Sequence, residues 1–320
     1  MAIGVLCARC LSNNLTKRVM PRLTVVVATY NRAESLIRCL SSFRKQSSPR
    51  EEWEVVVVNN NSKDDTEERF AQFVAANPDL PVRMVREERQ GLSHARNCGM
   101  AAAESPYIAI IDDDETVNED FVRGYIEFFD SHPKAVAAGG RIVPQYEQGR
   151  PSWVSHYTER PIANPLDLGD EVCPFGRGRC PGGGNMAVRR EAIERYGAFD
   201  PSLGRTGKRL IGGEETDFFN RLARSGEPFY YVPQSIIYHH ISPDKLIHDY
   251  FTRLSYAIGV SEQIRTRQIG AYGARIGSEV VKWAATLVLA VGYTFSFQWP
   301  KARYLLLMRA QITRGLLSKG

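Results

Sequence analysis

The sequence predicts an α/β fold built on a mostly parallel, doubly wound sheet flanked by helices. Short runs rich in Val and Ile alternate with helical patterns, and the first four runs start 25 to 30 residues apart, the length of a βαβ unit. Polar clusters follow three of these runs, at the strand ends where parallel sheets bind ligands. The chain of 320 residues is 43% hydrophobic and 24% charged, which is typical of a globular protein rather than a disordered one.

The apolar runs are expected to be strands buried on both faces, because β-branched residues dominate them. Strands are predicted at 23–28, 53–58, 82–85 and 107–111 in the first half of the chain and at 136–145, 182–193 and 229–240 in the second. Helices are predicted at 33–46, 64–77, 93–104 and 214–226. Asp64 and Ser93 are the expected N-caps of the second and third helices, since their side-chain oxygens can accept from free backbone N–H groups.

Three polar clusters lie at the ends of predicted strands: TYNR (29–32), NNNSKDDT (59–66) and DDDE (112–115). Because the carboxyl ends of parallel strands meet at one edge of a sheet, these clusters are expected to line one crevice. Asp112 and Asp114 are two residues apart, so both carboxylates can face a hard cation and leave positions for water and phosphate oxygens. A diphosphate with Mg²⁺ or Mn²⁺ fits this pattern. Taken alone, the acidic run would favour a solvated turn.

Six segments follow one another in a recognisable order: TVVVATYNR, VVVVNNNSKDDT, GLSHARNCGMA, YIAIIDDDE, GGEETDFFNRL and YHHISP. Together they resemble the motifs of glycosyltransferase family 2, inverting nucleotide-sugar enzymes with the GT-A fold, over about residues 22 to 260. Within that family the sequence is similar to bacterial exopolysaccharide enzymes of the succinoglycan type. The resemblance implies a metal-dependent hexosyltransferase that moves a sugar from a nucleotide-diphosphate donor, with UDP favoured, to a saccharide or lipid-linked acceptor in polysaccharide or glycan biosynthesis.

The resemblance also implies a set of nucleotide-sugar-binding residues: Thr29, Tyr30, Asn31, Arg32, Asn59, Asn61, Arg96, Asp112, Asp113 and Asn185. Residues 29–31 would line the nucleoside pocket. Asn59 stands where the family usually has an aspartate that reads the uracil ring, and its amide carbonyl can still accept from the ring N–H. Arg96 would hold the donor diphosphate with its planar fork. Asn185, in GGGNMAV, would hydrogen-bond the donor or acceptor, and a tight turn before a strand is an equal alternative.

The metal site implied by the resemblance combines the DxD motif with a histidine. Asp112 and Asp114 match this motif, and Asp114 is the stronger candidate for direct metal contact. Asp113 points the other way on an extended chain, toward the sugar or ribose. His239 is preferred over His240 as the residue that completes the coordination of Mg²⁺ or Mn²⁺ or meets the diphosphate. The cation would neutralise the departing nucleoside diphosphate.

The catalytic base implied by the resemblance lies in GGEETDF. Glu214 and Glu215 match the family's ED motif, whose acidic residue deprotonates the acceptor hydroxyl for in-line attack on the anomeric carbon. Glu215 is the first choice, although the family commonly has Asp there, and Glu214 is the second. Acidic residues in the first turn of a helix also complement its dipole, which is the alternative explanation.

Three regions are expected along the chain: an N-terminal extension at 1–22, a GT-A catalytic domain at 23–245 and a basic helical region at 246–320. The catalytic domain would divide into a nucleotide-sugar half, 23–115, and an acceptor half, 116–245. The N-terminus makes no convincing signal peptide, and Met20 is a possible alternative start.

The C-terminal region predicts contact with a membrane. Residues 253–320 carry ten Lys or Arg and two Glu, and 283–299 contains no charge and is bracketed by Trp283 and Trp299. This stretch is long enough either to span a thin bilayer or to lie in its interface. Basic ends on an acidic body favour a membrane surface over a nucleic-acid partner. The expected location is the cytoplasmic face of the cell membrane, with a packed helical tail as the alternative.

Two other functions compete with glycosyl transfer. A non-catalytic GT-A-like module that binds sugars or an assembly partner would be expected to lack the acidic residues, yet both the DxD and the ED carboxylates are present. A sugar nucleotidyltransferase would usually carry a Gly-rich basic loop after the first strand, where this chain has TYNRAES. The sequence therefore favours an active transferase over both.

Overall fold

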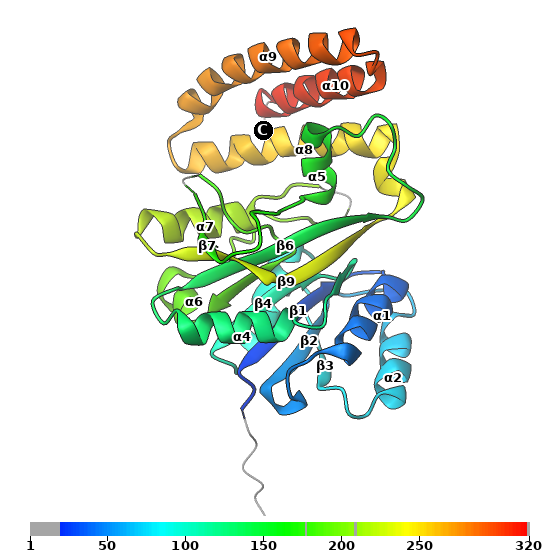
Figure 1. The fold of residues 1–320 in the computed structure, drawn as a ribbon, viewed down its shortest axis with the longest axis vertical. Coiled ribbons are helices and arrows are strands. Elements are labelled where there is room, and N and C mark those ends of the chain that lie inside the picture. The colour runs from blue at the N-terminus through cyan, green and yellow to red at the C-terminus, as the bar shows by residue number, and fades with distance from the viewer. Residues whose placement is uncertain (1–19, 177, 208–209, 319–320) are drawn as a thin grey trace, which may run out of the picture.

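The computed structural model describes residues 20–176, 178–207 and 210–318, and within them a single mixed sheet organises the fold (Figure 1). The sheet has nine strands in the order β3-β2-β1-β4-β8-β6-β9-β5, with β7 paired to β9. The strands are β1 (Leu23–Thr29), β2 (Trp53–Asn59), β3 (Val82–Arg86), β4 (Tyr107–Asp112), β5 (Glu115–Val117), β6 (Ala137–Tyr146), β7 (Cys173–Pro174), β8 (Met186–Arg189) and β9 (Phe229–Ile241). The first four are parallel, as predicted, whereas β8 runs antiparallel to β4 and joins them to the parallel pair β6 and β9.

Helices cover both faces of the sheet, which confirms the predicted doubly wound architecture. The helices are α1 (Ala33–Ser42), α2 (Thr66–Ala76), α3 (Leu92–Ala102), α4 (Phe121–Ser131), α5 (His156–Ala163), α6 (Arg190–Tyr196), α7 (Glu214–Arg224), α8 (His248–Gln268), α9 (Tyr272–Phe295) and α10 (Trp299–Leu316). One apolar core packs α1, α2 and α4 against the sheet, and a second core packs α3, α6 and α7 against its other face. Alternate residues of β1 and β2 point into the two cores, so these strands are buried throughout.

Some predicted elements differ from the structure. The predicted strand 182–193 divides into β8 and α6, and the loops expected at 144–184 contain α5. Ser93 is not an N-cap: α3 begins at Leu92, and the Ser93 hydroxyl donates to the Leu203 carbonyl instead. Asp64 precedes the cap position by one residue but still accepts from the backbone N–H of Thr66 at 3.2 Å.

A close approach of α3 to the sheet fixes where its side chains reach. A Cβ added to Gly99 would lie 2.2 Å from a methyl carbon of Val26 and 2.9 Å from one of Val58, so only glycine lets the helix lie this near β1 and β2. Arg96 is on the preceding turn of the same helix and is 1% exposed. Tight helix-to-sheet packing therefore places a buried guanidinium close to the carboxyl end of β4.

The last three helices form a separate layer beyond the carboxyl ends of the strands (Figure 1). A third apolar core joins α8 and α10 to α5 and the end of β9, through Phe251, Leu254 and Leu305 among others. α8 and α10 cross closely at Gly259 and Gly315, where an added Cβ would lie 2.0 to 2.1 Å from the facing backbone oxygen.

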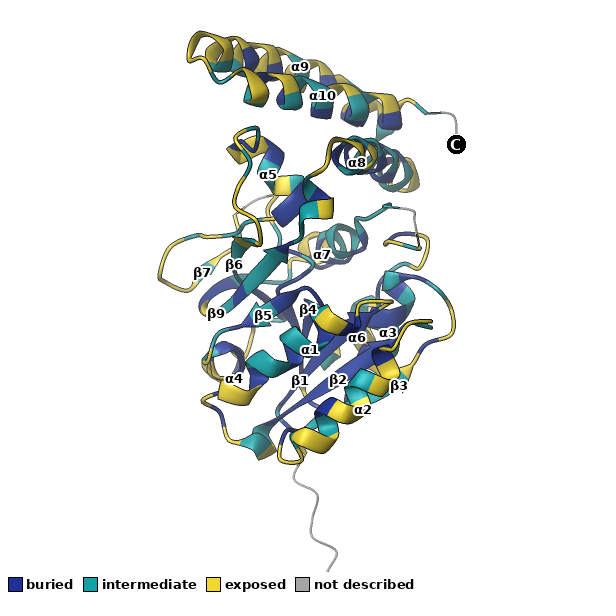
Figure 2. Ribbon diagram, turned by 90° about the vertical axis from the view of Figure 1, so that its right-hand side faces the viewer, coloured by how far each residue is buried: buried dark blue, intermediate teal, exposed yellow. Residues whose placement is uncertain are grey.

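α9 lies on the outside of this layer and is mostly exposed (Figure 2). Among the described residues, it is the helix whose length and composition would allow it to cross a membrane. Its exposed apolar side chains are Val280, Val281, Leu287, Val288, Val291 and Phe295. The predicted apolar stretch 283–299 thus falls on α9 and on the turn that leads into α10.

Candidate active site

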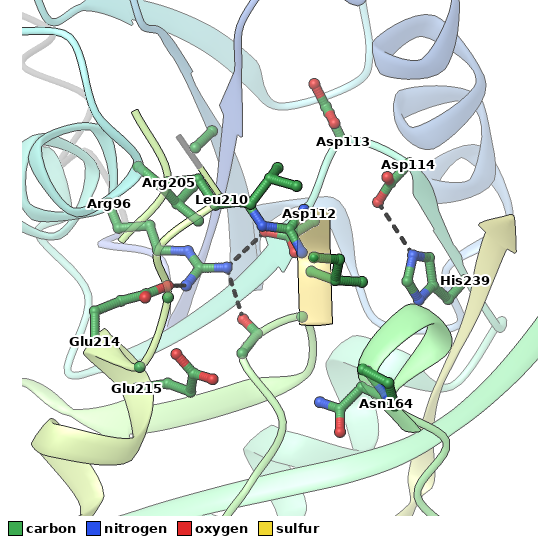
Figure 3. A pocket seen from close by; sticks show the side chains of 18 of the residues that line it. Arg96, Asp112, Asp113, Asp114, Asn164, Arg205, Leu210, Glu214, Glu215 and His239 are labelled. Atoms are coloured by element: carbon green, nitrogen blue, oxygen red, sulfur yellow. Dashed lines mark hydrogen bonds and ion pairs between the residues drawn. The ribbon is translucent and has the colours of Figure 1, made fainter. Parts of the chain in front are cut away.

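A cavity of about 490 Å³ lies at the carboxyl ends of β1 and β4, between the sheet and the C-terminal helices. Its wall combines segments that are far apart in the chain: Ala28–Tyr30, Arg32, Asp112–Glu115, Gly183–Gly184, Gly212–Thr216, His239, Lys245 and part of α8. Figure 3 shows Asp112 and Asp114, at and just after the end of β4, and Glu214 and Glu215 of α7 around this space. The polar clusters after the first and fourth strands therefore meet, as expected for the carboxyl ends of neighbouring parallel strands.

Asp113 and Asp114 are both buried and share Arg32, but their other partners differ. Asp113 accepts from the Thr29 hydroxyl at 2.8 Å and from Arg32 at 3.1 Å. Burial raises the pKa of Asp113 to about 6. Asp114 Oδ2 accepts from Arg32 at 2.9 Å and from Lys245 Nζ at 2.5 Å. Burial opposes ionisation of Asp114, but the charges of Lys245, His239 and Arg32 hold its pKa well below the usual value.

The two adjacent histidines have separate environments. The Nδ1 atom of His239 lies 3.0 Å from the Ala163 carbonyl oxygen, so Nδ1 carries the proton and Nε2 presents a lone pair to the cavity. Burial lowers the pKa of His239, which favours this neutral form. His239 Nε2 lies 3.7 Å from Asp114 Oδ1 (Figure 3). His240 turns away and bonds the Thr116 hydroxyl at 2.9 Å.

The donor set at the end of β4 fits a hard divalent cation. Carboxylate oxygens of Asp112, Asp114 and Glu115 lie within 4.8 Å of one another, and the lone pair of His239 faces Asp114. Oxygen ligands with one imidazole suit Mg²⁺ or Mn²⁺. Burial raises the pKa of Glu115 well above the usual value, and its carboxyl group already accepts from the backbone N–H of Asp112 at 2.9 Å. Because Glu115 is engaged in this way, Asp112, Asp114 and His239 are the suitable ligands.

A second acidic pair begins α7. Glu214 is buried, and its Oε1 accepts from Arg96 at 2.7 Å. Glu215 lies next to it and faces Gly183, and no ion pair is recorded for Glu215 in the described part of the chain. Burial and the neighbouring charge of Glu214 raise the pKa of Glu215 to about 8. Of the two glutamates, Glu215 is therefore the one whose carboxyl group is free to exchange a proton near neutral pH.

Arg96 connects the two acidic groups (Figure 3). Its Nη1 donates to Glu214 and its Nη2 donates to Asp112 at 2.6 Å and to the Gly183 carbonyl at 3.0 Å. Burial opposes the charge, but the two carboxylates raise the Arg96 pKa further. Its fork thus holds protein carboxylates in this structure, and its contact with a donor diphosphate stays a prediction.

The residues predicted to line the nucleoside pocket fall into two groups. Thr29, Tyr30 and Arg32 form part of the cavity wall. Asn31 and Asn61 instead hold the surrounding loops: the Asn31 side chain accepts from the Lys63 backbone N–H at 2.7 Å, and both asparagines have positive φ values, 52° and 65°. Asparagine tolerates this left-handed backbone better than most residues, which explains its use at both turns.

Asn59 and Asn185 are not part of the cavity wall in this structure, because both side chains are fully buried and hydrogen-bonded within the protein. Asn59 accepts from the Ser62 backbone N–H at 2.9 Å and donates to Glu67 at 2.8 Å, so it holds the loop after β2 rather than a base. Asn185 accepts from the Tyr125 hydroxyl and donates to two backbone carbonyls, which leaves no group for a sugar. Its tight-turn alternative is the structural role observed.

Lys245 is a charged residue of the cavity wall that the sequence did not indicate. It lies in the 3₁₀ turn Pro243–Leu246 after β9, and its side chain is 6% exposed. In the sequence it stands in a polar segment, HHISPDK, where a lysine would be expected in solvent. The one signal in the sequence was its position six residues after His239. To use that signal, one would have had to know how the chain turns after β9.

Comparison with known families decides the identity. The model of "Glycosyl transferase family 2" matches residues 24–197, more than half of the chain. The chain belongs to this family. It is therefore a glycosyltransferase, and the resemblance seen in the six motifs is confirmed.

Relatives of this glycosyltransferase differ in how much they share with it. A glucosyl-dolichyl phosphate glucuronosyltransferase of Haloferax volcanii is 25% identical over 254 residues, 76% of this chain and 77% of the relative. The succinoglycan biosynthesis protein ExoO of Rhizobium meliloti is 40% identical over 124 residues, 38% of this chain and 32% of the relative. The match thus spans about a third of ExoO.

A solved structure confirms the GT-A fold. The mannosyltransferase PcManGT of Pyrobaculum calidifontis, determined with GDP-Man and Mn²⁺, has a TM-score of 0.61, with 19% identity, and the match covers 94% of this chain and 88% of that one. The similarity therefore extends beyond the family domain into the C-terminal helices, although at this identity it concerns the fold alone.

Proposed function

We propose that this protein transfers a sugar, with inversion, from a nucleoside-diphosphate sugar to a hydroxyl of a saccharide or lipid-linked saccharide, and that it requires Mg²⁺ or Mn²⁺. The observation that carries the proposal is the placement of Glu215, a carboxyl with a raised pKa of about 8, in the same cavity as the strongly ionised Asp114. A single displacement at an anomeric carbon needs a base for the acceptor hydroxyl. It also needs, on the facing wall, a site that stabilises the departing diphosphate.

In this reaction Glu215 accepts the proton of the acceptor hydroxyl. The acceptor oxygen forms a bond to the anomeric carbon while the bond from that carbon to the phosphate oxygen breaks, and the bonding electrons leave with the nucleoside diphosphate. Attack and departure take place on opposite faces, so the configuration inverts. The neighbouring charge of Glu214 raises the Glu215 pKa, and the hydrogen bond from Arg96 holds Glu214 in place.

The departing diphosphate would lie beside the end of β4. Asp112, Asp114 and His239 would hold the cation, which when bound supplies electrostatic stabilisation of the leaving group. Arg32 pairs with Asp113 and Asp114 in the cavity wall, but 43% of its side chain is exposed, so an incoming phosphate can reach it.

Named relatives support this substrate class. PcManGT was determined with GDP-Man and Mn²⁺, and GalNAc-T7, with a TM-score of 0.53 and 17% identity, with UDP, GalNAc and Mn²⁺. The Haloferax relative is named for a glucosyl-dolichyl phosphate and ExoO for succinoglycan, so both a lipid-linked and a polysaccharide acceptor belong in the assay. UDP sugars are the first donors to try and GDP sugars the second.

The test is release of nucleoside diphosphate from a panel of nucleotide sugars with Mn²⁺. The proposal predicts turnover with at least one donor and acceptor, and its loss in Asp114→Ala. Turnover that persists in Asp114→Ala would remove the metal role. Nucleotide binding without hydrolysis or transfer across a wide acceptor panel would favour the non-catalytic sugar-binding module instead.

Membrane association is a second part of the proposal, supported by α9. Its exposed apolar side chains, including Leu287 and Val288, lie on the outermost helix. Lys282 on the same helix and Arg303 on α10 are also exposed. An exposed apolar face with neighbouring basic residues suits an anionic lipid surface. A lipid-linked acceptor would be encountered at such a surface, and the location that we propose is the cytoplasmic face of the cell membrane.

A further inference from the structure

Lys245 is buried against the carboxylate that the proposed metal site needs most. A lysine with a side chain only 6% exposed is uncommon, because removing an ammonium from water costs several kcal/mol unless it is paired. Its Nζ atom lies 2.5 Å from Asp114 Oδ2 and 3.3 Å from His239 Nε2. Both partners come from other parts of the site already described.

The two atoms that bind Lys245 belong to two of the three suitable metal ligands. His239 donates from Nδ1 to the Ala163 carbonyl, so the Nε2 lone pair can point either to an ammonium or to a cation. Asp114 Oδ2 already receives Arg32 as well as Lys245, and its other oxygen faces His239. A divalent cation that uses Asp114 and His239 must therefore share or displace the contacts of the Lys245 ammonium.

We propose that Lys245 is a resident counter-cation that competes with the divalent cation for Asp114 and His239 and moves to the donor's phosphate oxygens when the donor binds. This inference rests on the proposed function. Without a nucleotide, a cation at Asp114 would stand next to a buried positive charge, which like-charge repulsion disfavours. When a diphosphate is present, the negative charge of its phosphates offsets the charges of both the divalent cation and the Lys245 ammonium. Metal and nucleotide should consequently bind cooperatively, and the lysine should set the size of that coupling.

The position of Lys245 favours this role over that of a purely structural charge. Arg32 is shared between Asp113 and Asp114, so Lys245 is the second cation of this group of charges. Lys245 is also part of the cavity wall. A charge held there is within reach of an anionic ligand in a way that a lysine sealed in the core would not be.

The experiment measures Mn²⁺ binding to the full chain from the loss of the free Mn²⁺ electron paramagnetic resonance signal, with and without UDP or GDP. The variants are Lys245→Met and Lys245→Gln, which remove the charge. Lys134→Met, an exposed lysine on the turn after α4, is the matched control. The proposal predicts that either nucleotide strengthens Mn²⁺ binding to the wild type by about tenfold or more, and that both variants bind Mn²⁺ without nucleotide about tenfold more tightly than the wild type does.

The outcomes separate this inference from the proposed function. If the wild type binds Mn²⁺ with a nucleotide but both variants bind it without nucleotide no better than the wild type, the lysine proposal is overturned and the metal-dependent function stands. If Mn²⁺ does not bind to the wild type at any concentration of nucleotide, the metal-dependent function itself fails. Should both variants misfold, equal Mn²⁺ affinity of the wild type with and without nucleotide would still contradict the proposal.

Discussion

Carboxyl groups on opposite walls of the cavity differ in how many positively charged neighbours they have. At the end of β4, Asp114 has Arg32 and Lys245 within 2.9 Å and a histidine beyond them. At the start of α7, the ion pair from Arg96 goes to Glu214, and Glu215 has burial and a neighbouring carboxylate around it instead. The same chemical group therefore has a strongly lowered pKa on one wall and a pKa of about 8 on the other.

This difference teaches how one cavity can hold both an anionic ligand set and a base. A carboxylate that stays ionised at every ordinary pH serves to hold cations, whereas one that titrates near neutral pH serves to take up a proton. Arg96 touches both walls and gives its two Nη groups to Asp112 and Glu214. Among the described residues it makes no ion pair with Glu215, and in this way it separates the two roles.

The largest expected effect is on turnover in Glu215→Gln. The amide cannot accept the acceptor proton, so kcat should fall by about 10² to 10⁴-fold. Steady-state release of nucleoside diphosphate measures it. Glu191→Gln is the matched control, since Glu191 is also acidic and in the first turn of a helix but is exposed on α6, and it should leave kcat unchanged. A Glu215→Gln enzyme with nearly full activity would move the base to Glu214.

The next effect is on stability in Arg96→Met. The substitution keeps the volume of the side chain but leaves Asp112 and Glu214 without their cation, so the free energy of unfolding should fall by about 3–5 kcal/mol. Chemical denaturation measures this. Arg195→Met, which breaks a surface ion pair with Glu227, should cost about 0–1 kcal/mol. Similar small losses in both variants would mean that Arg96 does not hold the two walls together.

The pH dependence of kcat/KM should show the ionisation of Glu215. Glu215 has to be ionised to accept a proton, and its pKa in the free enzyme is about 8. The rate should therefore rise about tenfold per pH unit from pH 6 and level off above pH 8. In Arg96→Met, if it folds, the rise should shift to higher pH, since Arg96 lowers the Glu215 pKa. A flat profile between pH 6 and 9 would contradict this assignment.

The smallest expected effect is on lipid binding through α9. Replacing Leu287 and Val288 together with Asp puts two charges on the exposed apolar face and should weaken binding to anionic vesicles by about fivefold or more. Co-sedimentation of the full chain measures it. Val172→Asp changes an exposed valine far from α9 in the sequence and should have no effect. Equal binding by all three proteins would count against α9 as the contact surface.

Much of the fold and the two acidic pairs could be predicted because their signals are local. Buried parallel strands are continuous apolar runs, and the carboxylates of Asp112 and Asp114 follow one of them directly. The sequence did not indicate which polar side chains are buried. Asn185 resembles a polar binding residue in the sequence, but the loop before β8 turns its amide into the protein, where three partners use it.

Lys245 was missed for a related reason. It reaches Asp114 across 131 positions of the sequence, and the contact depends on where β9 ends and how the next turn bends. Sequence patterns describe neighbours along the chain, so they give no information about a partner that only the tertiary fold supplies.

One measurement tests the division of roles most directly: Mn²⁺-dependent binding of the nucleoside diphosphate to Asp114→Asn and to Glu215→Gln, by isothermal titration calorimetry, beside their turnover. If the two walls have separate roles, Glu215→Gln binds the nucleotide as the wild type does and turns over poorly, whereas Asp114→Asn loses the Mn²⁺-dependent part of binding. Equal loss of nucleotide binding in both variants, or intact binding in Asp114→Asn, would contradict that division.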